Sequence, residues 1–211
     1  MKRRRGQGAF VVLEGLDGAG TTTQAEAIAR KLRSEGVAVL ATREPSDGPI
    51  GNLLRQALTR RVGLPNGRGP LGPETLALLF AADRVDHLAA QIEPALEKGE
   101  VVICDRYLLS SLAYQGSELP MLFVEQINQK ARRPDLTLFV EVSTRIAAQR
   151  RATRGGEKEL FDAEARQKKI AGLYREAIAQ REGTERIVSL DGGLPIAQVT
   201  QQALAAIARV L

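Results

Sequence analysis

The sequence predicts a three-layer α/β fold, in which helices cover both faces of a five-stranded, mostly parallel sheet. The first observation is that short β-branched runs alternate along the 211 residues with longer segments of helical periodicity. The second is a glycine-rich turn that joins the first apolar run to a helix. The third is a composition of 44% apolar and 26% charged residues, which is typical of a globular protein. We therefore expect one domain spanning residues 1–211.

The predicted strands are short runs rich in valine, isoleucine and leucine. They are Phe10–Leu13, Val37–Ala41, Val101–Cys104, Leu136–Val140 and Arg186–Leu190. Between the first two, apolar residues recur at helical spacing from Ala25 to Leu32, and Gly36 is placed to end that helix. Strand, helix and strand together predict a βαβ unit with two parallel strands.

Helical patterns fill the gaps between the later strands. Pro73–Ala90 predicts a long helix, which Pro94 bends or restarts. Ser143 is placed to cap a helix that runs toward Arg154, and Pro195 is placed to open the last helix. These helices supply the two outer layers of the predicted fold.

The basic charge gathers at the N-terminus. Of the net charge of +5, Lys2, Arg3, Arg4 and Arg5 supply four, which leaves +1 for the rest of the chain. We interpret residues 1–8 as a flexible basic tail and expect no nucleic-acid partner. The apolar run after the tail is too short for a signal peptide, and no segment has the length of a membrane span. We therefore expect a cytoplasmic protein without a membrane partner.

A phosphate-binding loop is predicted where the first strand meets the first helix. The segment matches the Walker A pattern except at the lysine position. Glycines let backbone N–H groups approach phosphate oxygens, and the N-terminus of the helix adds a favourable dipole. Thr22 stands where this pattern binds Mg²⁺. The residues expected to bind the phosphates of ATP are Gly15, Leu16, Asp17, Gly18, Ala19, Gly20, Thr21, Thr22 and Thr23.

Thr21 stands in place of the lysine that normally meets the β- and γ-phosphates. Its neutral hydroxyl cannot neutralise the charge that develops during transfer. Losing one preorganised donor costs about 10²–10³ in rate, whereas a supplied arginine contributes about 10³–10⁵. We expect a lid at about residues 150–162, whose Arg150 and Arg154 close over the phosphates as catalytic residues.

Other kinds of catalytic centre have little support. His87 is the only histidine and Cys104 the only cysteine, which excludes zinc sites made of several histidines or thiolates. Acid–base catalysis by histidine is equally poorly supported, and we expect His87 to pack or to face solvent. Cys104 lies in an apolar run and is expected to be buried. Mg²⁺ delivered with ATP is the metal that fits.

Four further motifs follow the phosphate loop in order along the chain. They are Thr42-Arg43-Glu44-Pro45, Leu79-Phe80-Ala81-Ala82-Asp83-Arg84, Asp105-Arg106-Tyr107 and Pro134-Asp135-Leu136-Thr137. With that loop they resemble the thymidylate kinase family, and the similarity runs from Phe10 to about Tyr174. The resemblance implies the three-layer fold of P-loop NTPases and a kinase that phosphorylates dTMP with ATP and Mg²⁺.

The resemblance also implies where the acceptor phosphate and the metal bind. Asp105 and Arg106 follow a buried strand and are expected beside the phosphate loop, at the carboxyl edge of the sheet. Arg106 would hold the 5′-phosphate of dTMP with its planar fork, and Asp105 would hold Mg²⁺ through water. Arg43 is expected to be a second phosphate contact, with Glu44 and Arg55 as further candidates.

The base and the sugar have their own expected contacts. Phe80 and Arg84 are four residues apart and lie on one face of the predicted helix. The resemblance implies that Phe80 stacks on thymine and that Arg84 donates to a thymine carbonyl oxygen. It also places Ser111, in a short turn, near the base edge, Tyr114 against the ribose, and Asp17 at the 3′-hydroxyl.

Together these inferences predict in-line transfer from ATP to dTMP, giving ADP and dTDP without a covalent enzyme intermediate. Two alternatives stay open: a kinase for another deoxynucleoside monophosphate, and a catalytically weak nucleotide-binding protein disabled by Thr21. A regulatory GTPase is disfavoured, because Asn128-Gln129-Lys130-Ala131 does not match a guanine-reading Asn-Lys-x-Asp segment. The resemblance further implies a homodimer built from helices that flank the long helix.

Overall fold

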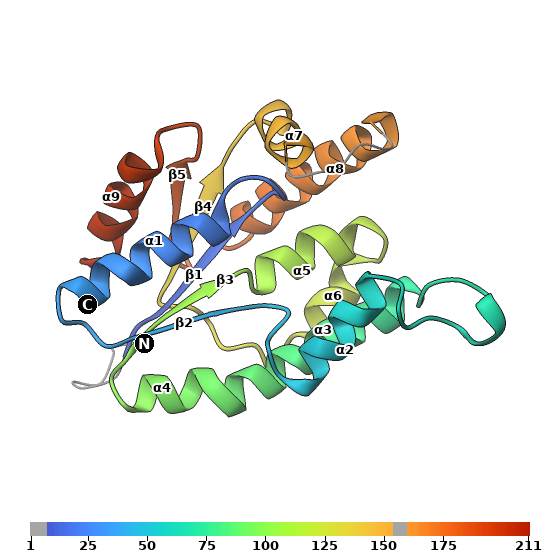
Figure 1. Cartoon of the computed structure of the whole chain (residues 1–211), viewed down its shortest axis with the longest axis horizontal. Coiled ribbons are helices and arrows are strands. Elements are labelled where there is room, and N and C mark those ends of the chain that lie inside the picture. Colours follow the sequence, from blue (N-terminus) through green and yellow to red (C-terminus); the bar gives the residue numbers. More distant parts are fainter. Residues whose placement is uncertain (1–7, 154–159) are drawn as a thin grey trace.

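The computed structural model describes residues 8–153 and 160–211. In these residues five strands form one sheet of order β2-β3-β1-β4-β5, and each neighbouring pair is parallel (Figure 1). The strands are β1 Phe10–Gly15, β2 Val39–Arg43, β3 Val101–Asp105, β4 Leu136–Glu141 and β5 Ile187–Asp191. The predicted α/β fold with a five-stranded sheet is therefore confirmed.

Helices connect the strands and cover the sheet (Figure 1). The α-helices are α1 Thr21–Ser34, α2 Pro49–Leu58, α3 Pro73–His87, α4 Glu93–Glu97, α5 Leu108–Tyr114, α6 Met121–Ile127, α7 Thr144–Ala152, α8 Leu160–Ala179 and α9 Ile196–Ile207. Shorter helical turns are η1 Pro65–Gly67, the π-helical turn η2 Leu88–Ile92, and η3 Gln115–Ser117. Helices α2, α5 and α6 were not predicted from the sequence.

Two apolar layers hold the sheet between the helices. On one face, α1 and α9 pack against β1, β3 and β4 through buried aliphatic side chains such as Ile28, Val199 and Leu13. On the other face, η2 and α4 pack on β1 and β3, with Ile92 and Cys104 both fully buried. Beside them, α5 and α8 cover β4. Burial on both faces explains why the central strands read as continuous apolar runs.

The strand order positions the functional residues. β1 lies between β3 and β4, and its register pairs Leu13 with Asp105. The carboxyl ends of β1 and β3 therefore meet at one edge of the sheet, where the chain turns into the phosphate loop and into α5. Crevices at this edge of parallel sheets are where α/β proteins bind ligands.

Several details differ from the sequence prediction. β2 covers Val39–Arg43 rather than Val37–Ala41, because the turn that closes α1 extends further. There Gly36 has a φ of +82°, and the amide of Val37 donates to Leu32 O at 3.1 Å. The expected flexible tail does not include Gly8, which is buried and donates to Leu96 O at 2.8 Å. Residues 1–7 lie outside the described residues.

The long helix is also more complex than predicted. α3 ends at His87, the wider turn η2 follows, and α4 restarts at Glu93 with Pro94 in its first turn, where the missing proline N–H costs least. Ser111 lies within α5 and not in a short turn. Within the described residues no helix is both long enough and apolar enough to span a bilayer.

Candidate active site

The phosphate loop joins β1 to α1 in a conformation that requires glycine. Gly18 and Gly20 have φ values of +92° and +101°, which side chains disfavour. A Cβ on Gly18 would also lie 2.5 Å from the carbonyl oxygen of Ala147 in α7. α1 begins at Thr21 without a side-chain cap and without an acidic residue in its first turn. Its first N–H groups are therefore available to an anion.

Thr22 and Asp105 meet at the start of α1. The Thr22 hydroxyl donates to Oδ2 of Asp105 at 2.5 Å, although the two residues are 83 positions apart. Oδ1 of Asp105 is buried and has no hydrogen-bond partner in the described part of the chain. A buried carboxylate oxygen without a partner is costly, and a cation or its water would satisfy it. Oxygen donors of this kind suit Mg²⁺, and the metal site expected at Thr22 and Asp105 stays a prediction.

The side chain of Thr21 is buried, and its methyl carbon lies 3.3 Å from where a Cβ on Gly15 would be. Positive charge reaches the loop from α7 instead. Arg150 donates to Ala19 O at 3.1 Å and to Gly192 O at 2.9 Å, and Arg151 donates to Asp17 O at 2.7 Å. Arg154 and residues 155–159 of the predicted lid lie outside the described residues.

Arg106 links the phosphate loop to the start of α5. Its backbone is left-handed, with φ at +70°, which is uncommon for a residue with a side chain. Its guanidinium donates to Asp17 Oδ1 at 2.6 Å and to Gly15 O at 3.1 Å, and lies 5.3 Å from the centre of the Tyr114 ring. Burial opposes its charge, but Tyr174, Tyr114 and Asp17 together raise the pKa of Arg106. The guanidinium therefore stays charged.

Glu14 lies beneath Arg106, at the end of β1, and is fully buried. Its carboxylate accepts from the amides of Tyr107 and Ser110 at 3.0 and 3.2 Å, from the Ser110 hydroxyl at 2.5 Å, and from the Tyr174 hydroxyl at 3.3 Å. Burial raises the pKa of Glu14, while the hydrogen bond from Ser110 and the charge of Arg106 oppose the rise. The carboxylate fastens the start of α5 to β1.

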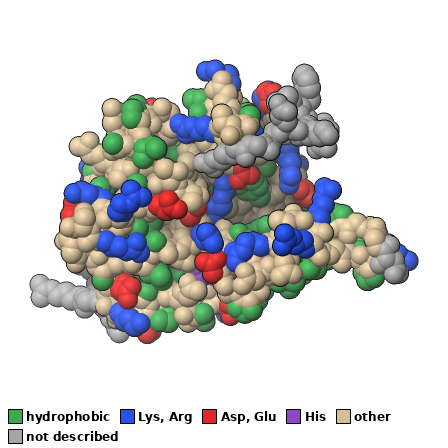
Figure 2. Space-filling view, in the orientation of Figure 1, with side chains coloured by type: hydrophobic (Ala, Val, Ile, Leu, Met, Phe, Trp, Pro, Cys, Tyr) green, Lys and Arg blue, Asp and Glu red, His purple; other side chains and the backbone are tan. Residues whose placement is uncertain are grey.

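A cavity of about 370 Å³ opens beside Arg106, and Figure 2 shows a hollow between the α8 side and the α2–α3 side of the molecule, with basic side chains at its edge. Six residues that the sequence assigned to acceptor binding line it. They are Asp17, Phe80, Arg84, Arg106, Ser111 and Tyr114. Residues from three separate segments of the chain are thus brought to one cavity.

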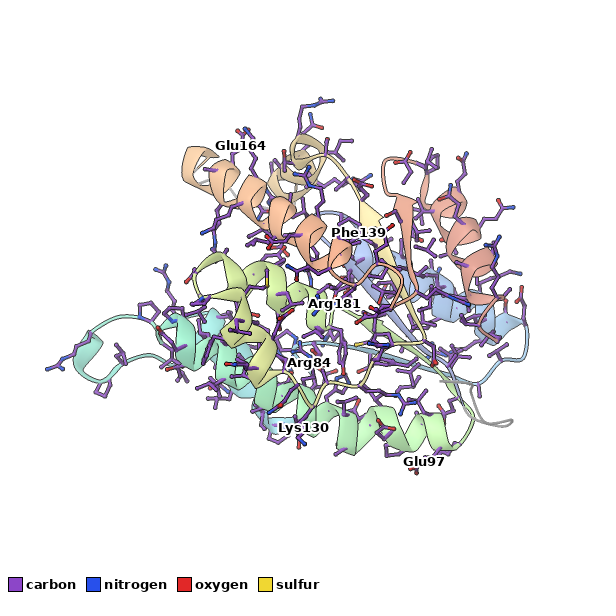
Figure 3. All side chains as sticks on the ribbon, turned by 180° about the vertical axis from the view of Figure 1, so that it is seen from behind. Arg84, Glu97, Lys130, Phe139, Glu164 and Arg181 are labelled. Carbon is purple, nitrogen blue, oxygen red and sulfur yellow. The ribbon has the colours of Figure 1, made fainter. Side chains whose placement is uncertain are left out.

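Arg84 forms the inner wall of this cavity and is 1% exposed (Figure 3). Nη2 donates to Glu44 at 2.6 Å and to Ser111 at 3.0 Å, and Nη1 donates to Asn128. Its Nε–H has no partner among the described residues. One donor of this buried guanidinium is therefore unpaired in the described part of the chain.

The structure does not bring Arg43 into the cavity. Its side chain is 56% exposed and pairs with Asp47 at 2.8 Å, in a stretch that leaves the edge strand β2. Arg55 also approaches Asp47, at 3.3 Å, and donates to Pro45 O. Arg43 is not among the residues that line the larger cavity, and its expected contact with the acceptor phosphate stays a prediction. Glu44, expected as a phosphate contact, is instead the buried partner of Arg84.

Sequence reasoning assigned no role to several residues of the cavity wall, and two of them are glutamines. Gln115 and Gln167 both line the cavity, and the Oε1 atom of each is buried without a partner among the described residues. Gln115 directly follows Tyr114, which was expected to contact the ribose, and this position could have marked it as a residue of the cavity wall. Nothing in the sequence marked Gln167, which comes from α8 on the far side of the cavity.

A second cavity, of about 200 Å³, lies on the other side of the phosphate loop. Its wall includes Ala19, Gly20, Arg150 and the apolar side chains of Leu194 and Ile196. The first cavity contacts the loop at Asp17 and the second at Ala19 and Gly20. Two ligand-sized spaces thus flank one anion-binding loop, which suits transfer of a phosphoryl group between two bound molecules.

Comparison with known proteins shows which family this chain belongs to. The family model described as thymidylate kinase matches residues 13–203. The chain belongs to the thymidylate kinase family. This confirms the resemblance of the motifs, the predicted fold and the predicted kinase activity, and nothing in the comparisons favours either alternative function.

Relatives from archaea and bacteria share most of the chain. A probable thymidylate kinase of Pyrococcus abyssi is 44% identical over 80% of this chain and 82% of its own length. A probable thymidylate kinase of Pyrobaculum calidifontis is 36% identical over 96% of this chain and 97% of its own length. The thymidylate kinase of Pseudomonas fluorescens is 37% identical over 92% of each chain. The similarity therefore covers both cavities.

Proposed function

We propose that this chain transfers the γ-phosphoryl group of ATP to dTMP, with dTMP in the 370 Å³ cavity and ATP on the phosphate loop and in the smaller cavity. The observation that carries the proposal is the position of Arg106. It faces the larger cavity while it donates to Gly15 O and Asp17 Oδ1 of the loop. The same guanidinium is therefore within reach of the acceptor phosphate and next to the donor site.

Donor binding would use the free N–H groups at the start of α1. Thr22 and Asp105 would hold Mg²⁺, directly or through water, since their oxygens converge and Oδ1 of Asp105 has no partner among the described residues. When bound, the ion would neutralise charge on the β- and γ-phosphates. The N-terminus of α1 would orient the triphosphate through its uncapped N–H groups and its dipole.

Acceptor binding would use the polar groups that converge on the larger cavity. Phe80 would stack on the base, and the guanidinium of Arg84 would donate to a carbonyl oxygen of thymine. Gln115, which also lines the cavity, would accept from the ring N–H through its side-chain oxygen. Tyr114 and Asp17 would contact the ribose. Arg43 would contact the phosphate after leaving Asp47, with which it forms an exposed ion pair.

Arg150 is our candidate for the charge that the absent lysine would provide. Its guanidinium lies against Ala19 O and lines the smaller cavity, which we assign to the nucleotide donor. Preorganised donors act most strongly on charge that develops in a site shielded from water. The proposal therefore predicts that phosphoryl transfer depends more strongly on α7 here than it would if the loop had its own lysine.

We also propose a homodimer formed through α3 and α6. Leu78 and Val85 are seven residues apart on α3 and are 51% and 48% exposed, and Leu122 on the adjacent α6 is 64% exposed. Three exposed aliphatic side chains on two packed helices are typical of an interface. Sedimentation of the intact protein and of a Leu78→Lys, Leu122→Lys double variant tests this, and a wild-type monomer would refute it.

A coupled ADP-release assay tests the kinase proposal. The substrates are ATP with dTMP, dUMP, dCMP and dGMP in turn, with and without Mg²⁺. We expect turnover with dTMP to exceed that with the others and to need the metal. Binding of dTMP without turnover would identify a nucleotide-binding protein, and preference for another monophosphate would identify a different kinase. Either result would overturn the proposal.

A further inference from the structure

A chain of buried polar contacts runs from the end of β2 to the wall of the acceptor cavity. The Thr42 hydroxyl lies 2.7 Å from Nε2 of His87, and Nδ1 of His87 lies 3.4 Å from Oε1 of Glu44. Oε2 of Glu44 accepts from Nη2 of Arg84 at 2.6 Å. The side chains of His87, Glu44 and Arg84 are 0%, 3% and 2% exposed. The sequence had suggested packing or solvent exposure for His87, and the structure gives it two polar partners.

The chemistry of the partners fixes the direction of these hydrogen bonds. A carboxylate oxygen can only accept, so Nδ1 of His87 carries the hydrogen that faces Glu44. In a neutral imidazole Nε2 is then an acceptor, and it accepts from the Thr42 hydroxyl. Each member thus orients the next.

Glu44 has one distinct role for each oxygen. Among the described residues, Oε2 accepts a hydrogen bond from Arg84 and Oε1 contacts His87. His87 also lies three residues after Arg84 in α3, on the same face of the helix. It therefore fastens the segment that carries Thr42 and Glu44 to the helix turn that carries Arg84.

We propose that His87 is a positioning residue for recognition of the acceptor base. This inference rests on the proposed function, in which Arg84 donates to a base carbonyl. His87 does not line the cavity. It acts by fixing the Glu44 carboxylate, which holds Nη2 of Arg84, and Arg84 in turn lines the cavity.

The physical basis is the cost of a buried group without its partner. Without the Nδ1–H donor, Oε1 of Glu44 would remain buried and unpaired, and the carboxylate would turn toward other donors. Because Glu44 and Arg84 are both excluded from water, a small rotation of the carboxylate moves the guanidinium with it. Base recognition then weakens while the phosphate loop, on the other side of Arg106, is left intact.

Three substitutions separate the two contacts of the ring. His87→Asn keeps an N–H near the position of Nδ1 and so keeps the donor to Glu44. His87→Gln places its amide near Nε2, so it can bond Thr42 but leaves Glu44 without its partner. His87→Leu removes both contacts at similar volume. Ile92→Val, in the core between η2 and the sheet, is the control for general destabilisation.

Steady-state kinetics and thermal unfolding of the full chain provide the test. We expect His87→Gln and His87→Leu to raise the KM for dTMP about tenfold, as loss of a buried charge-assisted hydrogen bond would. The KM for ATP should stay within about twofold, and His87→Asn should restore most of the loss. Preference for dTMP over 5-methyl-dCMP, which has an amino group in place of the carbonyl oxygen at ring position 4, should fall in the same two variants.

The possible contrary results are distinct. If wild type does not turn over dTMP, the proposed function fails and the inference falls with it. If wild type is active but His87→Gln and His87→Leu keep the KM for dTMP, His87 has no positioning role. An equal rise of the KM for dTMP in all three His87 variants would show that His87 only stabilises the fold. A parallel rise of the KM for dTMP and the KM for ATP, as in Ile92→Val, would show the same. Either result would overturn the inference.

Discussion

Nη2 of Arg106 donates to Oδ1 of Asp17 at 2.6 Å, which joins the end of β3 to the phosphate loop that follows β1. A second donor, Nη1, reaches Gly15 O at 3.1 Å. The left-handed backbone of Arg106 directs its side chain back over the loop, and Glu14 fixes the helix that follows. The acceptor cavity and the donor loop are therefore parts of one hydrogen-bonded unit.

Replacing Arg106 by lysine keeps the charge but removes the planar fork. We expect Arg106→Lys to lower kcat/KM for dTMP by about 10²–10³, because an ammonium cannot hold the loop carbonyl, Asp17 and a phosphate at once. Arg133→Lys is the control, since the Arg133 side chain is 63% exposed and contacts Glu185, away from both cavities. Equal activity of the two variants would show that Arg106 acts through charge alone.

Restoring the missing lysine should raise the rate. Thr21→Lys would place an ammonium at the first residue of α1, beside the site proposed for the β- and γ-phosphates. We expect kcat to rise by about tenfold or more, since one preorganised donor contributes about 10²–10³ where nothing else replaces it. Single-turnover measurements at saturating ATP and dTMP would show the gain, with Ser34→Lys at the exposed end of α1 as control. A fall in kcat would show that the buried methyl of Thr21 is needed to hold the loop.

Removal of Arg150 tests the proposed substitute for that lysine. We expect Arg150→Ala to lower kcat by about 10²–10³ and to leave the KM for dTMP nearly unchanged, because Arg150 lines the donor cavity and not the acceptor cavity. Arg145→Ala removes an exposed arginine from the same helix and should have little effect. A loss of threefold or less in Arg150→Ala would exclude this role. In a Thr21→Lys background the same change should cost much less.

The sequence was sufficient for the sheet and for the edge where ligands bind. Short apolar runs marked all five strands, because central parallel strands are buried on both faces, and glycines marked the phosphate loop. Asp105 and Arg106 could be placed beside the loop because parallel strands end at one edge of the sheet. Their proximity, through the Thr22–Asp105 and Arg106–Asp17 hydrogen bonds, agrees with that reasoning.

What the sequence could not predict depends on contacts between distant segments. Arg43 has a local partner, Asp47, four residues away, and nothing in the motif shows that this pairing directs it outward. His87 looked isolated, because its partners Thr42 and Glu44 lie 45 and 43 residues away. Arg151 was expected to belong to the cationic lid, and only the packing of α7 on the loop shows that it donates to the Asp17 carbonyl.

The buried carboxylate of Glu14 predicts a pH dependence of stability. Burial raises its pKa in the folded state above the ordinary value of a glutamate. A raised folded pKa means that its contribution to stability is fully present below the unfolded pKa and is lost as pH rises through the folded pKa. We therefore expect the free energy of unfolding of wild type, relative to Glu14→Gln, to fall with rising pH. The slope should be about 1.4 kcal/mol per pH unit between the two pKa values.

Urea unfolding at several pH values from 4 to 8 measures this difference in the free energy of unfolding. The test is how the difference changes with pH. Its absolute size is not the test, because glutamine changes the hydrogen bonds at every pH. Glu164→Gln is the matched control, because Lys168 in the next turn lowers the pKa of Glu164 and Glu164 is exposed. Its contribution has the opposite sign, being lost as pH falls through the folded pKa, and solvent screening makes it small. A relative stability that rises with pH in the Glu14 pair would mean that the four donors around Glu14 outweigh its burial, and that the carboxylate stabilises the junction of β1 and α5 most when it is charged.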